Sequence, residues 1–298
     1  MSDPTVICFG EILWDIFPDR EVIGGAPLNV ALRLHSYGVD VAIISRIGSD
    51  AYGLDAMASI QETGMSTQLI QTDDTLETGK VEITLDTTGG ASYQINQPVA
   101  WDAIKLNSTA VGQVRRAPFF VFGTLAVRGS YNIVTLRELL EVAQTKIFDV
   151  NLRAPHYNTS MVYELMQIAD FIKLNDEELV ELCADLGCNE KEHTARIQWL
   201  LKTTNTEGIC VTMGEEGAML FFEGELFQQK GIKVSVVDTV GAGDSFLATL
   251  IYELFLNNTP PKLALQRACV VGGLVASKKG ANCQIDEQEI VRMLAQSK

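Results

Sequence analysis

Several features that mark common classes of protein are missing from this chain of 298 residues. No stretch approaches the ~18 unbroken apolar residues of a membrane span. The segment Met1–Pro4 has neither the basic nor the long apolar part of a secretory signal. Lysine and arginine number 23 against 38 acidic residues, so the formal net charge is −15, which argues against nucleic acid or an anionic membrane as a partner. The sequence predicts a soluble, cytoplasmic, globular protein.

Cysteine and histidine patterns typical of metal or redox sites are also missing. The six cysteines include no C-x-x-C pair, and the three histidines stand far apart. Cys183 and Cys188, five apart in a helical pattern, are interpreted as reduced, small hydrophobic residues. The sequence therefore predicts no zinc site.

Motifs of several enzyme classes are absent as well. There is no G-x-x-x-x-G-K-[ST] loop, no G-x-G-x-x-G after the first apolar run, and no H-E-x-x-H or G-x-S-x-G. This argues against a dehydrogenase or an α/β-hydrolase.

What the chain does contain is a regular alternation of apolar runs and helical patterns. Most helical patterns directly follow a run, which predicts an α/β fold with a doubly wound, mostly parallel sheet and helices on both faces. The predicted strands are 6–9, 41–45, 119–122, 146–150 and 171–174, and the predicted helices are 28–37, 54–63, 131–144, 160–169 and 176–186.

Residues 67–101 depart from this rhythm. Strand-like pieces that alternate polar and apolar residues lie at 68–71, 80–85 and 92–94, with turn signals between them. We expect a small sheet with one wet face, suited to act as a lid over a site at the carboxyl ends of the main strands.

The most informative stretch is VDTVGAGDSF at 237–246. The β-branched run 231–237 is expected to be an extended strand, and a helix is expected to begin near Ala242. Backbone N–H groups of Gly241–Gly243 would converge at the positive end of the helix dipole, a place suited to a phosphoryl group. Asp244 would then accept a proton from an attacking alcohol. Taken alone, the string is explained better by a helix that Asp244 caps, because such turns are common.

Two segments near the start carry groups suited to a sugar. Gly24 and Gly25 precede a proline at a helix start and allow close approach to the backbone, while Asn29 offers a donor and an acceptor. Asp15 follows an indole, a pairing that polyol recognition uses. The alternative for Gly24, Gly25 and Asn29 is a helix start that binds no ligand. The alternative for Asp15 is a surface turn.

Three later segments follow predicted strands. Asn175 and Glu178 lie three apart at a helix start, where they would hold Mg²⁺ waters or form a capping box, and the two are compatible. Thr212 precedes a glycine turn that would flank a nucleotide or form an ordinary hairpin. Arg153 would bind an anion or sugar oxygens, or serve as a surface ion-pair partner.

Together these segments resemble the ribokinase/PfkB family of carbohydrate kinases over essentially the whole chain. The two family signatures resemble residues 24–38 and 238–246, in the right order and separation. The family's N-x-x-E element and T-x-G turn match residues 175–178 and 212–214. The resemblance implies a single ribokinase-like domain over 1–298, with a β-lid formed mainly by about 12–24 and 67–101.

The resemblance also implies ATP and Mg²⁺ as cofactors, and K⁺ in many members. It makes Asp244 the catalytic base and the N–H groups of Gly241, Ala242 and Gly243 the anion hole for the γ-phosphate. The other implied roles are sugar binding by Asp15, Gly24, Gly25, Asn29, Asn151 and Arg153; nucleotide binding by Lys173, Asn175, Thr212, Gly214 and Gly217; Mg²⁺ binding through water by Glu178; and K⁺ binding by Asp238 and Val240 near Ser277–Gly280.

Within the family, residues 10–18, 123–126 and 149–153 look most like fructokinases, so the expected acceptor is D-fructose, phosphorylated at its primary hydroxyl to fructose 6-phosphate. Ribose, 2-keto-3-deoxygluconate or a nucleoside as acceptor, and a non-catalytic sugar sensor, stay open as alternatives. Residues 269–272 depart from the family, whose members often carry an asparagine near the adenine. Some members form homodimers through their lids, and the sequence leaves monomer and dimer open.

Overall fold

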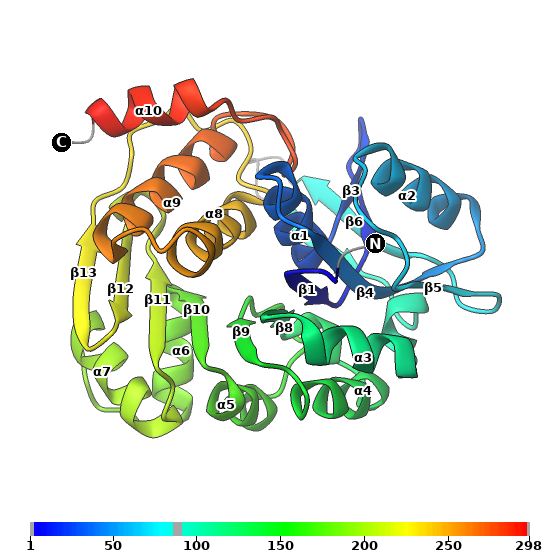
Figure 1. The fold of residues 1–298 in the computed structure, drawn as a ribbon, viewed down its shortest axis with the longest axis horizontal. Helices are drawn as coiled ribbons and strands as arrows, with labels where there is room; N and C mark the ends of the chain where they lie inside the picture. The colour runs from blue at the N-terminus through cyan, green and yellow to red at the C-terminus, as the bar shows by residue number, and fades with distance from the viewer. Residues whose placement is uncertain (1–2, 86–90, 297–298) are drawn as a thin grey trace. The chain divides into compact units, whose positions relative to one another are not determined.

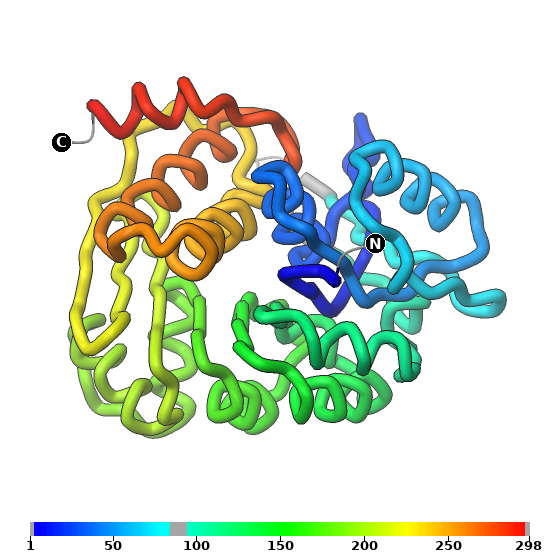
Figure 2. Tube along the Cα trace, in the orientation of Figure 1, coloured from blue at the N-terminus to red at the C-terminus, as the bar shows by residue number. Residues whose placement is uncertain are grey.

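A computed structural model describes residues 3–85 and 91–296 (Figure 1). The chain divides into two compact units, Met1–Gln144 and Thr145–Lys298, and Figure 2 follows the Cα path through each. Within the described ranges, no helix has the length and apolar character needed to cross a membrane.

The first unit contains four parallel strands in the order β8-β1-β4-β5. β1 and β4 are buried along their whole length, as expected of parallel strands covered on both faces. The strands are β1 (Val6–Phe9), β4 (Val41–Gly48), β5 (Ile70–Asp73) and β8 (Phe119–Gly123), and the helices are α1 (Ala26–Ser36), α2 (Ala51–Glu62), η1 (Ala100–Ala103), α3 (Ser108–Arg116), η2 (Leu125–Val127) and α4 (Ser130–Leu140).

A separate four-stranded sheet lies in the same unit, in the order β3-β2-β6-β7. β2 pairs antiparallel with β3 and parallel with β6, and β6 pairs antiparallel with β7. Leu13, Val81 and Ile83 form its buried apolar cluster. The strands are β2 (Leu13–Ile16), β3 (Glu21–Gly24), β6 (Gly79–Leu85) and β7 (Ala91–Ile95). The small sheet expected beside the main one is thus present.

The small sheet differs from the expectation in one strand. The piece at 68–71 does not join it, because β5 pairs in parallel with the second half of β4. Alternation of polar and apolar residues fits an edge strand of the large sheet as well as a strand of a small one, so the pattern alone did not decide the partner. Residues 86–90, in the expected turn between β6 and β7, lie outside the described residues.

The second unit contains five strands in the order β13-β12-β11-β10-β9. β9, β10 and β11 are parallel, whereas β12 and β13 continue the sheet antiparallel. The elements are β9 (Thr145–Asp149), α5 (Thr159–Ile168), β10 (Phe171–Asn175), α6 (Asp176–Asp185), α7 (His193–Thr204), β11 (Gly208–Thr212), η3 (Gly214–Glu216), β12 (Ala218–Phe222), β13 (Glu225–Gln229), α8 (Ala242–Ile251), η4 (Tyr252–Leu256), α9 (Pro261–Ala276) and α10 (Glu287–Gln296).

The run 231–237, expected to be extended, belongs to no strand. Val236 and Val237 are 64% and 55% exposed, so this β-branched run has no sheet to pack against. β-branched residues favour a strand only where a pleated, half-buried surface receives them. The prediction of a strand here was wrong, whereas the helix after it begins at Ala242 as predicted.

Candidate functional site

Asp15 and Gly24 face each other across the first two strands of the small sheet. Asp15 lies in β2, and a Cβ placed on Gly24 of β3 would come within 2.7 Å of the Asp15 carboxylate oxygen Oδ2. Gly24 therefore leaves room for that carboxylate. The indole of Trp14, expected to cover a sugar, instead contacts Tyr52: its Nε1 donates a hydrogen bond to the Tyr52 carbonyl at 3.0 Å, and the rings lie 5.8 Å apart.

Gly25 caps the N-terminus of α1 with a φ of 111°, a conformation that favours glycine. A Cβ there would collide with the Glu11 carbonyl oxygen. The buried Glu11 carboxylate accepts a hydrogen bond from the Ala26 N–H at 3.3 Å, where the helix dipole favours a negative charge. Asn29, one turn further, is 4% exposed. Glu11 is thus a buried acidic neighbour of the predicted sugar residues that the sequence did not single out.

In the second unit, a buried ion pair joins the ends of two neighbouring strands. Lys173 of β10 is in register with Asp149 of β9, and its Nζ lies 3.0 Å from Asp149 Oδ1. The other carboxylate oxygen, Asp149 Oδ2, is buried without a hydrogen-bond partner in the described part of the chain. The sequence predicted Lys173 but missed Asp149. The signal that could have revealed the pair is an acidic residue and a basic residue near the ends of two consecutive predicted strands.

Three acidic side chains attract the charge of the Lys173 amine. Burial lowers the pKa of Lys173, but the attraction of these carboxylates outweighs burial, so its pKa is raised and the amine stays charged. The three carboxylates belong to Asp149, Glu178 and Asp244. Burial also raises the pKa of Glu178, against the opposing effect of Lys173.

Asn175 and Glu178 form the predicted capping box at the start of α6. Asn175 Oδ1 accepts the Glu178 N–H and Glu178 Oε2 accepts the Asn175 N–H, each at 2.8 Å. Glu178 Oε1 also accepts the Leu152 N–H at 2.8 Å. Glu178 therefore ties the helix start to the loop that carries Asn151. Asn151 has a φ of 42°, whereas Arg153 is exposed and donates a hydrogen bond to the Leu152 carbonyl.

The turn before α8 has the predicted glycine geometry. Gly241 is the N-cap with a φ of 73°, and a Cβ on it would collide with Ala281. A Cβ on Gly243 would lie 3.4 Å from Lys173 Nζ, so the amine stands directly beside the turn. Asp244 follows in the first turn of the helix. The structure thus brings the predicted anion hole, the predicted base and Lys173 together.

The residues expected to hold a monovalent cation are also neighbours. Asp238 Oδ1 accepts the Val240 N–H at 3.1 Å, and Oδ2 accepts the Gly280 N–H at 3.2 Å. Within the described ranges, no group of three or more His, Cys, Asp or Glu side chains is arranged to hold a metal ion.

Thr212, Gly214 and Gly217 form the turn of the β11–β12 hairpin. Thr212 pairs with Asn175 on one side and Ala218 on the other. Gly217 has a φ of 106°, and a Cβ on it would collide with the Gln229 carbonyl oxygen, so packing against β13 by itself requires glycine there. The hairpin interpretation is confirmed, and Thr212 lies at the strand end beside Asn175.

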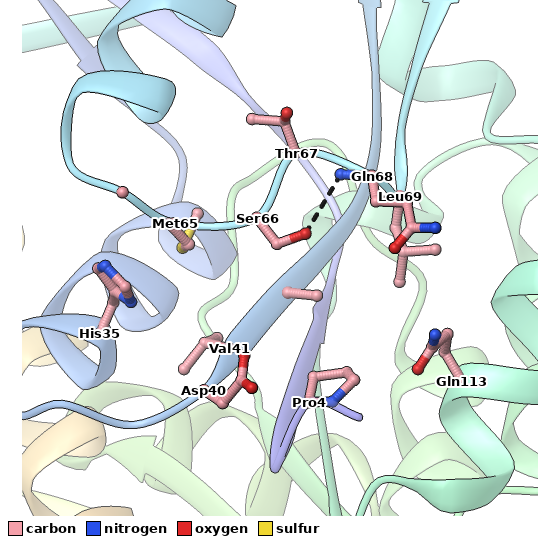
Figure 3. Close-up of a pocket in the computed structure, with 12 residues that line it drawn as sticks. Pro4, His35, Asp40, Val41, Met65, Ser66, Thr67, Gln68, Leu69 and Gln113 are labelled. Atoms are coloured by element: carbon pink, nitrogen blue, oxygen red, sulfur yellow. Dashed lines mark hydrogen bonds between the residues drawn. The ribbon is translucent and has the colours of Figure 1, made fainter. Parts of the chain in front are cut away.

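A pocket of about 820 Å³ lies elsewhere in the first unit (Figure 3). Its lining includes Val41 and Ala42, which begin β4, so it opens at the amino ends of the strands. His35 also lines it, with Nε2 3.1 Å from the Thr63 carbonyl oxygen. None of the predicted site residues lines this pocket.

Residues 15–288 match the description pfkB family carbohydrate kinase. The chain belongs to this family. It is therefore a sugar kinase, a phosphotransferase with an alcohol group as acceptor, and its fold is the predicted α/β ribokinase-like fold.

Named relatives include fructokinases. A probable chloroplastic fructokinase-6 from Arabidopsis thaliana is 25% identical, over 97% of this chain and 82% of the relative. A fructokinase from Xylella fastidiosa solved with bound ATP has a TM-score of 0.84 at 23% identity, covering 99% of each chain. A fructokinase double mutant from Vibrio cholerae solved with fructose, ADP and potassium has a TM-score of 0.82 at 20% identity, covering 99% of this chain and all (100%) of that one.

Proposed function

We propose that this PfkB kinase transfers the γ-phosphoryl group of ATP to the primary hydroxyl of a ketose. D-fructose is the acceptor that we propose. The observation that carries the proposal is the start of α8, where the Gly241–Gly243 turn, Asp244 and the Lys173 amine lie together. Fructose is supported by the fructokinases among the relatives.

The reaction needs a base, groups that stabilise the negative charge of the phosphoryl group, and correct positioning of the two substrates. Asp244 takes the proton of the attacking hydroxyl. Backbone N–H groups of Gly241–Gly243 receive the charged oxygens of the γ-phosphoryl group at the positive end of α8. The chain's contribution is electrostatic and positional, without a covalent intermediate.

Mg²⁺ would be held through water by Glu178, with Asp149 beside it. Carboxylate oxygens are the ligands that Mg²⁺ prefers, and the buried Asp149 Oδ2, unpartnered in the described chain, suits such a group. When bound, the ion neutralises phosphate charge. Lys173, Asn175, Thr212, Gly214 and Gly217 would bind the nucleotide. Asp238 and Val240 would hold K⁺, the ion in the Vibrio cholerae fructokinase.

The sugar would be held by two groups of residues. Asp15 and Asn29 offer a carboxylate and an amide, and Gly24 leaves room for the Asp15 carboxylate. Gly25 would approach the sugar with its backbone. Asn151 and Arg153 would complete sugar binding from the loop after β9.

We further propose that a second copy can pair through the small sheet. β3 and β7 are its edge strands, whose free backbone groups are able to pair with another strand. Light scattering over a concentration series tests this, and a monomer at every concentration would contradict it.

A coupled ADP-release assay tests the activity. The panel contains fructose, ribose, 2-keto-3-deoxygluconate and a nucleoside, each with and without Mg²⁺ and K⁺. We expect Mg²⁺-dependent ADP release, with the highest kcat/KM for fructose. A higher value for another sugar would overturn fructose as the acceptor, and no ADP release with any of them would overturn the proposed function.

A further inference from the structure

The pocket of about 820 Å³ in the first unit lies away from the predicted sugar residues (Figure 3). Pro4, which lines the pocket, precedes β1, whereas Glu11, the neighbour of Gly25, follows β1. An extended chain of this length spans roughly 20 Å, so the pocket and the predicted sugar site lie at opposite ends of one strand. Small-molecule sites have volumes of about 300 to 1,000 Å³, and this pocket is large enough for a compound of disaccharide size.

Two side chains in the wall of the pocket each have a buried polar atom without a hydrogen-bond partner. The atoms are Gln113 Oε1 and His35 Nδ1, and neither has a partner within the described part of the chain. Gln113 belongs to α3 and His35 to α1, and Figure 3 shows their side chains on opposite sides of the pocket. Buried polar atoms in native proteins are normally hydrogen-bonded, so both missing bonds require an explanation.

Both atoms are hydrogen-bond acceptors. The oxygen of the Gln113 amide can only accept. His35 Nε2 lies 3.1 Å from the Thr63 carbonyl oxygen, and because a carbonyl cannot donate, Nε2 carries the proton of this hydrogen bond. A neutral imidazole that donates from Nε2 accepts at Nδ1. The missing partners are therefore O–H or N–H donors, which a ligand can supply.

The other lining residues narrow the class of ligand. None of the described residues that line the pocket is lysine or arginine, whereas Asp40 contributes a carboxylate. Anionic ligands are bound mainly through basic side chains, so a nucleotide or a sugar phosphate does not suit this wall. The Ser66 hydroxyl accepts the Gln68 N–H at 3.4 Å and can donate its own proton to a ligand. Met65 and Leu69 add apolar surface.

We propose that this pocket is a second binding site, which takes an uncharged polyhydroxy compound, a polyol or a small oligosaccharide. Hydroxyl groups of the ligand donate to Gln113 Oε1 and His35 Nδ1, and its C–H surface contacts Met65 and Leu69. The last torsion of a glutamine side chain is soft, so Oε1 can turn towards the ligand. Both acceptors are neutral, and hydroxyl donors satisfy them without bringing an unpaired charge into the wall. The site takes no part in phosphoryl transfer, so the proposal does not rest on the proposed function.

Saturation-transfer NMR on the full chain, without ATP, measures Kd for sorbitol, myo-inositol and trehalose. Gln113→Leu removes the amide acceptor at similar size and should raise Kd for the probe that binds most tightly by about tenfold. Gln61→Leu is the matched control, because it makes the same substitution at an exposed position of α2 that does not line the pocket. This control should leave Kd unchanged. If Gln113→Leu does not fold, His35→Phe is measured instead, with a similar increase in Kd expected.

Asp15→Asn distinguishes the pocket from the predicted sugar site, since binding in the pocket should survive this substitution. A Kd that rises with Asp15→Asn but not with the pocket variants would overturn the proposal, and so would a failure of all three probes to bind. Sorbitol 6-phosphate and 1,4-diaminobutane are the charged probes. Tighter binding of either at a site that Gln113→Leu weakens would overturn the assignment to an uncharged ligand. Because the binding test contains no ATP, a failed kinase assay would overturn the proposed function without affecting this result.

Discussion

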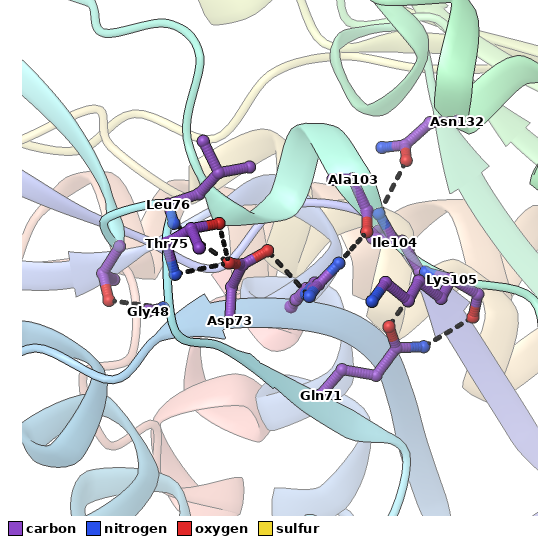
Figure 4. Close-up of polar contacts among 11 residues, drawn as sticks. Gly48, Gln71, Asp73, Thr75, Leu76, Ala103, Ile104, Lys105 and Asn132 are labelled. Carbon is purple, nitrogen blue, oxygen red and sulfur yellow. Dashed lines mark hydrogen bonds and ion pairs between the residues drawn. The ribbon is translucent and has the colours of Figure 1, made fainter.

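Arg46 Nη2 lies 2.7 Å from Asp73 Oδ2, and both side chains are buried (Figure 4). Arg46 Nη1 also donates a hydrogen bond to the Ala103 carbonyl, and Asp73 Oδ1 accepts hydrogen bonds from the backbone N–H groups of Thr75 and Leu76. The pair joins β4 and β5 to η1 and to the segment that leads into β6. It therefore anchors one end of the small sheet to the larger one within the first unit.

This pair makes stability depend on pH. Burial opposes ionisation of Asp73, but hydrogen bonds from Leu76 and Thr75 and the charge of Arg46 outweigh burial and lower its pKa to about 2. An unfolded aspartate has a pKa of about 3.9. The stabilisation is therefore fully present above about pH 5 and is lost as the pH falls towards 2.

We expect Asp73→Asn to lower the free energy of unfolding at pH 7 by about 3 kcal/mol, because it leaves the buried Arg46 without its carboxylate. The difference in free energy of unfolding between this variant and the unsubstituted chain should become smaller as the pH falls from 5 towards 3. Urea unfolding across this range measures it. A difference that stays constant with pH would contradict the role assigned to the Asp73 charge.

Asp244→Asn should lower kcat by at least about 1000-fold, because the amide cannot take the proton of the attacking hydroxyl. Its Tm should stay within a few degrees of the unsubstituted value. Glu177→Gln, an exposed substitution in the first turn of α6, serves as the control and should leave kcat unchanged. An active Asp244→Asn enzyme would remove Asp244 from the mechanism.

Gly241→Ala should destabilise the chain by about 2–4 kcal/mol, since a positive φ and a collision with Ala281 combine. Gly224→Ala is the matched control: Gly224 has a φ of 82° but nothing within 4 Å of its Cβ position, so about 1 kcal/mol is expected. Chemical denaturation compares them. If both variants lose the same free energy of unfolding, Ala281 moves away from the new methyl group without destabilising the chain.

Glu178→Gln should raise the Mg²⁺ concentration needed for half-maximal rate by about tenfold, because the uncharged amide binds Mg²⁺ waters less well. It also replaces one of the two oxygens that accept the Asn175 and Leu152 N–H groups, so a stability loss of about 1–2 kcal/mol is expected. A Mg²⁺ titration of the initial rate at saturating ATP tests the first effect. An unchanged Mg²⁺ requirement would leave Glu178 with its capping role alone.

Features that depend on neighbours along the chain could be predicted from the sequence. The capping box between Asn175 and Glu178 spans three residues, and the start of α8 at Ala242 follows from adjacent glycines. Most strands and helices of both units lie where apolar periodicity placed them. Periodicity did not reveal that β5 pairs with β4, because an alternating strand fits more than one sheet.

By itself, the sequence determined the α/β alternation, the glycine turn before Asp244 and the membership in the PfkB family that these motifs predict. Each of these depends only on residues that are close together along the chain. Only the tertiary structure decided that Lys173 meets Asp149, that Gly24 makes room for Asp15, and which strands share a sheet. Strand order and register bring together residues far apart in the chain, and no local pattern encodes those distances.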